Sequence, residues 1–166
     1  MAFDSLAPFA RWLAATPVSK EIGKAAWVTP AVQSVHILAI AIVMSGMLML
    51  DLRLLRVVGR QQSVQTFTDR YLPWVWWALL VLLTSGVVLI VGEPARELQS
   101  TVFALKMGLI LGAAGLALLV RRPLPADHAY WDAPHRRPVG QAIAVASMTI
   151  WACVVFAGRW IAYAQG

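Results

Sequence analysis

Residues 71–92 of this chain read YLPWVWWALLVLLTSGVVLIVG and contain no charged side chain. An α-helix needs about 20 consecutive, mostly apolar residues to cross a lipid bilayer, so this run is long enough to be one span. Three further apolar runs of similar length lie on either side of it, at residues 30–50, 101–120 and 140–162. The sequence therefore predicts four transmembrane helices.

The composition of the whole chain supports four spans. Of its 166 residues, 60% are hydrophobic and 13% are charged, whereas soluble domains contain roughly 45–50% apolar and about 25% charged residues. A chain of this size cannot bury so much apolar surface in one core, so a soluble enzyme, a disordered tail and a fibrous repeat are excluded. Because short connections make the helices antiparallel, the predicted fold class is all-α, an integral membrane four-helix up-down bundle.

The sequence divides into an N-terminal segment, residues 1–29, and the bundle, residues 30–166. Apolar residues recur at helical spacing near the N-terminus, and Thr16-Pro17 marks a stop. This pattern predicts a short amphipathic helix lying at the membrane interface. Thr29 and Asp69 are the predicted N-caps of the first and second spans. The single cysteine, Cys153, excludes an intrachain disulfide.

The 14 Lys and Arg side chains give a net charge of +6, but they fall in short clusters between apolar runs. This distribution differs from the single basic stripe of nucleic-acid-binding proteins, so no nucleic-acid partner is predicted. Eight of these side chains lie in the loops after the first and third spans, and four lie in the N-terminal tail and the loop after the second span. Because cytoplasmic loops carry an excess of Lys and Arg, we expect those two loops in the cytoplasm and both termini outside.

Ionisable side chains inside a span are costly and usually have a partner or a function. His36 lies six residues into the first span and Lys106 five residues into the third, about 8–9 Å from the outer ends of these helices. Near the same level, Glu93 closes the second span and Arg159 lies close to the end of the fourth. Structural interpretations remain open for each group. Lys106 and Arg159 can reach lipid phosphates, His36 can hydrogen-bond to a neighbouring helix, and Glu93 can simply end a helix.

Two helix faces carry further patterns. On the first span a stripe at three- and four-residue steps contains Gln33, His36, Ile40, Met44, Met47 and Asp51. It offers an imidazole and two thioethers to the bundle interior, although methionine at this spacing more often fills a core. On the third span Ala104, Gly108 and Gly112 form a ridge of small residues, which favours close helix packing.

A lone intramembrane histidine beside cationic side chains suits a b-type haem, because neutral imidazole ligates iron and cations neutralise the propionates. We therefore predict that His36 is the metal ligand and that His36, Lys106 and Arg159 bind the haem. The other histidines, His128 and His135, lie in the loop after the third span and cannot complete the two His pairs of a di-haem cytochrome. Nucleophilic triads, phosphate loops and paired carboxylates are absent from the sequence, so no catalytic residue is assigned.

The segment from Ser34 to Ala41, SVHILAIA, followed by Ser45-Gly46-Met47 and residues 51–56, DLRLLR, resembles the first helix of small bacterial membrane proteins. These proteins are related to the CopD copper-resistance domain and to HemJ-type protoporphyrinogen oxidases. Residues 103–109, FALKMGL, are similar to the aromatic-x-x-Lys segment of a later helix in those families. The resemblance implies haem on His36, with Lys106 either the opposite ligand or a substrate or propionate contact. It also implies a bacterial inner membrane, in which the two termini predicted to lie outside would be periplasmic.

Three hypotheses of function follow. In the first, a membrane-embedded haem b protein moves electrons between a membrane reductant, such as a quinone, and a periplasmic-side partner, and any enzymatic activity is that of an oxidoreductase. In the second, the chain is a non-catalytic subunit or anchor of a larger membrane complex or homo-oligomer. In the third, His36, Met44 and Met47 pass a cuprous ion along the first helix.

Overall fold

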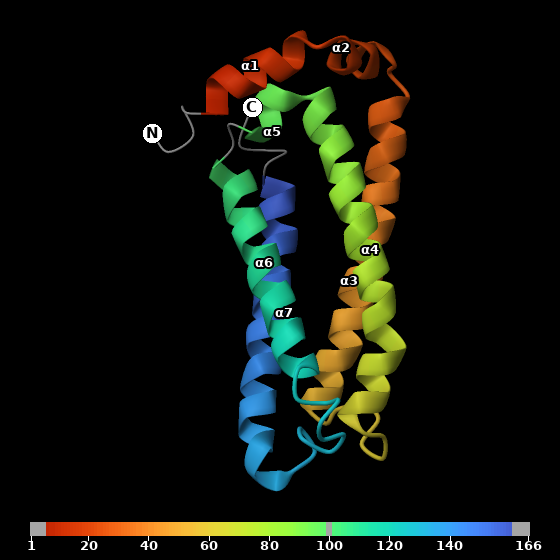
Figure 1. Cartoon of the computed structure of the whole chain (residues 1–166), viewed down its shortest axis with the longest axis vertical. Helices are drawn as coiled ribbons and strands as arrows, with labels where there is room; N and C mark the ends of the chain where they lie inside the picture. Colours follow the sequence, from red (N-terminus) through yellow and green to blue (C-terminus); the bar gives the residue numbers. More distant parts are fainter. Residues whose placement is uncertain (1–5, 99–100, 161–166) are drawn as a thin grey trace.

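The computed structural model describes residues 6–98 and 101–160, and within them the side chains of residues 96, 97, 101 and 158–160 are left undescribed. Four long helices dominate it: α3 (Val28–Leu54), α4 (Val64–Gly92), α6 (Thr101–Arg121) and α7 (Arg137–Trp160). Each is long and apolar enough to cross a membrane. The predicted all-α, multi-pass bundle is therefore confirmed (Figure 1).

Short helices cover one end of the bundle. α1 (Ala7–Ala15) and α2 (Pro17–Lys24) lie across the ends of the long helices, near α5 (Pro94–Leu98) (Figure 1). Thr16 separates α1 from α2, and its hydroxyl caps α2 by accepting a hydrogen bond from Ser19 N at 3.3 Å. The predicted stop at Thr16-Pro17 is confirmed. We call the end of the bundle that these short helices cover the terminal end. The opposite end, the loop end, carries residues 55–63 and 122–136, including η2 (Pro134–Arg136).

The four long helices form two hairpins, α3 with α4 and α6 with α7, which meet where α3 packs against α7 (Figure 1). The contact between them is tight toward the loop end, where buried residues of α3 and α6 gather from Ala39 and Ala113 onward. Toward the terminal end the packing loosens, because residues 28–38 of α3 and 102–112 of α6 include no buried residue. The upper parts of the two hairpins diverge accordingly (Figure 1).

Two predicted N-caps are wrong. α3 begins at Val28 with Trp27 as its N-cap, two residues before the expected start. α4 begins at Val64, where Ser63 Oγ accepts a hydrogen bond from Thr66 N at 3.2 Å, and Asp69 lies inside the helix. Hydropathy marks the part of a helix that suits the membrane, whereas a cap marks where helical hydrogen bonding begins. In α4 the first turns are polar, so the helix begins at Val64, before its apolar run begins at Tyr71.

The closest helix approach does not involve the predicted ridge of small residues. Gly108 and Gly112 are exposed, and a Cβ added to Gly108 would meet no atom within 4 Å. Within the described chain Gly108 therefore contacts no other helix, whereas a Cβ added to Gly112 would lie 4.0 Å from Ile150 Cδ1 of α7. A Cβ added to Gly46 of α3 would instead lie 2.6 Å from Val75 Cγ2, so the missing side chain of Gly46 is what lets α3 and α4 approach.

Candidate functional site

His36 lies on the half of α3 toward the terminal end, and its imidazole is half-buried against α4. His36 Nδ1 is 2.8 Å from Ser85 Oγ. Ser85 Oγ also lies 2.6 Å from the Val81 carbonyl oxygen. A carbonyl oxygen can only accept, so the single hydroxyl proton of Ser85 is used in that bond. Ser85 must then accept a hydrogen bond from His36 Nδ1–H.

This pairing fixes the tautomer of the neutral imidazole. With the proton on Nδ1, the lone pair of His36 Nε2 is free to bind a metal ion or accept a proton. Metal-ligating histidines commonly have this arrangement, in which the second ring nitrogen donates a hydrogen bond that orients the ring. Gly86, the next residue on α4, leaves space beside the ring, because a Cβ there would be 3.8 Å from His36 Cε1.

A groove of about 230 Å³ runs beside Ser85 between α3 and α4. Its walls are formed by Val32, Val35, Val81, Thr84, Ser85 and Val88. Ligand pockets usually measure about 300–1,000 Å³, so this groove is too small and too open to hold a haem. A macrocycle would need the space between the two hairpins, on the side of α3 that faces α6.

Lys106 belongs to the other hairpin, formed by α6 and α7. It lies on α6, close enough to His36 for its charge to act on the imidazole. This proximity agrees with the similar depths predicted for His36 and Lys106. Arg159 belongs to α7, but its side chain lies outside the described set, as does any contact it makes. Glu93 is the C-cap residue of α4, which agrees with the interpretation that it ends a helix.

The residues at this level fit one face of a haem site. His36 offers a neutral ring nitrogen, Lys106 offers a cation, and residues 28–38 of α3 and 102–112 of α6 include no buried residue. Among the described residues, no three His, Cys, Asp or Glu side chains gather into a metal site.

The two methionines of the His36 stripe are core residues. Met47 is 2% exposed, and Met44 packs against the same buried cluster, which includes Val43, Val75 and Trp151. Their side chains fill space between helices. Met44 and Met47 therefore act as core residues in this structure.

The last residue of the stripe, Asp51, lies in a second polar position nearer the loop end. It is 2% exposed, and its Oδ2 has no hydrogen-bond partner. Ser147 of α7 faces the carboxyl, and its buried hydroxyl is also unpartnered. Trp151, one turn further along α7, buries its indole N–H without a partner as well. Sequence reasoning noted Asp51 as part of a stripe but missed Ser147.

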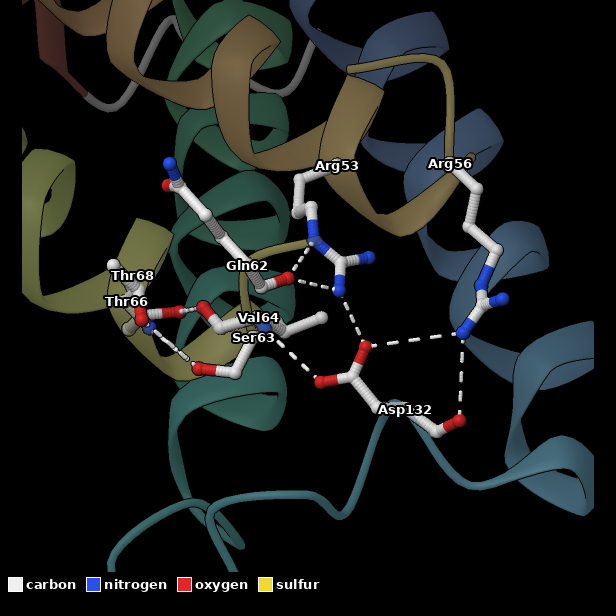
Figure 2. Close-up of polar contacts among 8 residues, drawn as sticks. All are labelled: Arg53, Arg56, Gln62, Ser63, Val64, Thr66, Thr68 and Asp132. Atoms are coloured by element: carbon white, nitrogen blue, oxygen red, sulfur yellow. Dashed lines mark hydrogen bonds and ion pairs between the residues drawn. The ribbon is translucent and has the colours of Figure 1, made fainter. Parts of the chain in front are cut away.

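At the loop end, one carboxylate holds three segments together (Figure 2). Asp132 Oδ1 accepts a hydrogen bond from Arg53 Nη2, and Oδ2 accepts one from Val64 N at 3.1 Å. Arg53 also donates from Nε to the Gln62 carbonyl oxygen at 2.7 Å, while Arg56 donates to the Asp132 carbonyl oxygen at 3.4 Å. We call this set the Asp132 clamp. It ties the loop before α7 to the turn between α3 and α4.

The clamp buries a charge. The side chain of Arg53 is 3% exposed, and Arg56 adopts a backbone φ of +60°, a left-handed conformation that is uncommon for a residue other than glycine. Arg56 follows the C-cap of α3, and its conformation belongs to a Schellman motif, in which Arg56 N donates to the Arg53 carbonyl oxygen at 3.0 Å and Val57 N donates to the Leu52 carbonyl oxygen at 2.9 Å. Arg53 and Arg56 were counted in the sequence only as topology signals, because their partner lies 79 and 76 residues away.

Comparison with known proteins identifies one family. The family model of DUF6644, a family of unknown function, matches residues 9–164. The match includes all four long helices almost to the end of the chain. No curated protein and no solved structure matches the sequence.

Proposed function

This chain belongs to the DUF6644 family, and for this member we propose a membrane-embedded b-type haem protein that moves electrons. The electrons pass between a membrane reductant, such as a quinone, and a partner on the periplasmic side of a bacterial inner membrane. The observation that carries the proposal is the hydrogen bond from His36 Nδ1 to Ser85 Oγ, which leaves Nε2 as the atom able to ligate iron. If the protein is an enzyme, it is an oxidoreductase.

Each polar residue at this level has a role in the proposal. His36 Nε2 would hold the iron, and Ser85 would keep the ring in the required tautomer and orientation. Lys106 and Arg159 would carry positive charge toward the two propionates. Haem supplies one-electron transfer when bound. The chain's own residues orient the group and shield it from water.

The proposed orientation places both termini in the periplasm. Eight of the 14 Lys and Arg side chains lie in the loops at the loop end or in the helix ends that adjoin them, and four lie at the terminal end. The His36 level then lies in the periplasmic half of the membrane, which suits transfer to a partner on that side.

An absorption spectrum of the purified protein tests this function. The wild-type protein from a haem-replete host should show a Soret band and, after reduction, the peaks of b-type haem. His36→Ala should lose most of this absorbance while still inserting into the membrane. His135→Ala is the matched control, because this histidine is exposed in the loop before α7 and should not affect the spectrum. A colourless wild-type protein would overturn the proposal.

A second candidate function is that of a subunit or anchor of a larger membrane complex, or of a homo-oligomer. The observation favouring it is the exposed face of α6, where Gly108 has no neighbour within 4 Å to contact an added Cβ. Small residues let another helix approach closely in a membrane. Cross-linking from Cys substitutions on this face would detect such a partner, and a protein that is both colourless and cross-linked would favour this function.

A further inference from the structure

The buried carboxyl of Asp51 lies outside the His36 site and has a different chemistry. Asp51 belongs to α3, three residues before the end of that helix, and is 2% exposed. Ser147 faces it from α7 and is 1% exposed. Asp51 Oδ2 and Ser147 Oγ both lack a partner in hydrogen-bonding geometry. Buried polar atoms are nearly always hydrogen-bonded and buried charges are nearly always paired, so a buried carboxyl with an unpartnered oxygen requires a physical explanation.

No cation within the described residues neutralises this carboxyl. Arg53, two residues further along α3, is bound to Asp132 and to the Gln62 carbonyl oxygen. The helices packed against this part of α3 carry other charged or titratable groups, none of them in an ion pair or hydrogen bond with Asp51: Asp69, Arg70 and Tyr71 on α4, and Arg137 on α7. An unpaired carboxylate in such a place is costly.

We propose that Asp51 and Ser147 form a proton-binding site inside the bundle. A proton bound to Asp51 Oδ2 converts this acceptor into a donor, and its O–H group can then donate to Ser147 Oγ. One proton thus removes the buried negative charge, which Ser147 cannot do, because a hydroxyl can donate to a carboxylate but cannot neutralise it. The carboxylate and the proton combine to a carboxylic acid, with no electron transferred. A proton also needs no cavity, whereas a water molecule or a metal ion needs added volume.

The position of Asp51 indicates from which side the proton comes. Three residues of helix separate Asp51 from the end of α3, a distance of about 4–5 Å along the axis. The proton therefore exchanges with water at the loop end, when the contact between α3 and α7 opens. The site uses neither His36 nor a cofactor, so it stands whether or not the protein binds haem.

Infrared spectroscopy of the full-length protein in lipid vesicles tests the site. A protonated carboxyl has a C=O stretching band well separated from the bands of carboxylates. The wild-type protein should show this band at neutral pH, with a small shift in D₂O. Asp51→Asn should abolish it, whereas Asp69→Asn, which changes an exposed carboxylate of α4, should leave it unchanged. Ser147→Ala should keep the band but move it to higher frequency, because the acid loses its hydrogen-bond acceptor.

Three results would overturn the proposal: absence of the band at neutral pH, its persistence in Asp51→Asn, or its loss on adding sodium, which would indicate a cation site. If Asp51→Asn fails to fold, Ser147→Ala assigns the band instead. A shifted band then supports the site, and an unshifted band contradicts it.

Discussion

The hydrogen bond between His36 and Ser85 leads to a prediction about the His36 tautomer that can be tested without haem. In protein labelled with ¹⁵N-histidine, NMR should show the neutral His36 ring protonated at Nδ1, because Ser85 Oγ accepts that proton. Ser85→Ala removes the acceptor and should shift the ring toward the Nε2–H tautomer. Loss of a partner that orients a metal ligand typically lowers metal affinity 10–100-fold, so haem retention should fall by about that factor.

Thr84→Ala is the control for Ser85→Ala. Thr84 is an exposed hydroxyl on the same helix, and it donates to the Leu80 and Val81 carbonyl oxygens without touching His36. An unchanged His36 tautomer in Ser85→Ala would show that Ser85 does not set the protonation of the ring. Equal losses of haem in both variants would assign the effect to the helix and not to the hydrogen bond.

For single residues, the sequence predicts the depth of ionisable side chains in the membrane better than it predicts which neutral side chains they contact. His36 and Lys106 could be placed at one level because rise per residue converts position into depth. Ser85 could not be assigned, since it lies 49 residues from His36 and its contact depends on how α3 and α4 are rotated. The same rotation decides that Met47 is buried in the core.

Among the helices and loops, the Asp132 clamp makes the strongest prediction about stability. Asp132→Ala leaves Arg53 buried without its carboxylate and Val64 N–H without its acceptor. Removing one partner of a buried ion pair typically costs about 3–5 kcal/mol. The variant should therefore show a lower thermal midpoint in detergent and faster amide exchange in residues 122–136.

Asp127→Ala is the matched variant for the clamp. Asp127 lies in the same loop, is exposed, and accepts a local hydrogen bond from Ala129 N at 2.9 Å. Its removal should change the thermal midpoint little. Similar losses in both variants would mean that the clamp contributes no more than an ordinary loop contact.

The helices themselves were largely predictable, but their ends were not. Four apolar runs identified the spans because the membrane requires a minimum apolar length. The start of α4 at Val64 depends on the Ser63 cap, which lies in a polar stretch that hydropathy does not register. The ridge at Gly108 was assigned to close packing on residue size alone, yet the close approach occurs at Gly46, where the facing residue is Val75.

For the whole molecule, the prediction concerns orientation in the membrane. A reporter fused after Gly166 should be active in its periplasmic form, since the basic loops are expected on the cytoplasmic side. A reporter fused after Pro125, in the loop before α7, should be active in its cytoplasmic form. The reverse pattern would place the His36 level in the cytoplasmic half and remove the argument for a periplasmic partner.

The arrangement of the two hairpins could not be derived from the sequence. Apolar periodicity reports which residues avoid water, but inside a membrane both the core and the lipid-facing surface are apolar. The tight packing at the loop end depends on side chains far apart in the chain, such as Trp131, which packs in one buried cluster with Leu50 and Leu54 of α3. Such contacts become visible only in the folded chain.

The spacing within the Asp132 clamp also orders events during synthesis. Arg53 is made 79 residues before Asp132. A ribosome that adds about 5–20 residues per second needs about 4–16 s to reach it. During that interval Arg53 carries its charge without this carboxylate, so in the proposed orientation it can help to retain the first loop in the cytoplasm. When Asp132 arrives, the same guanidinium becomes a buried anchor that joins the second hairpin to the first.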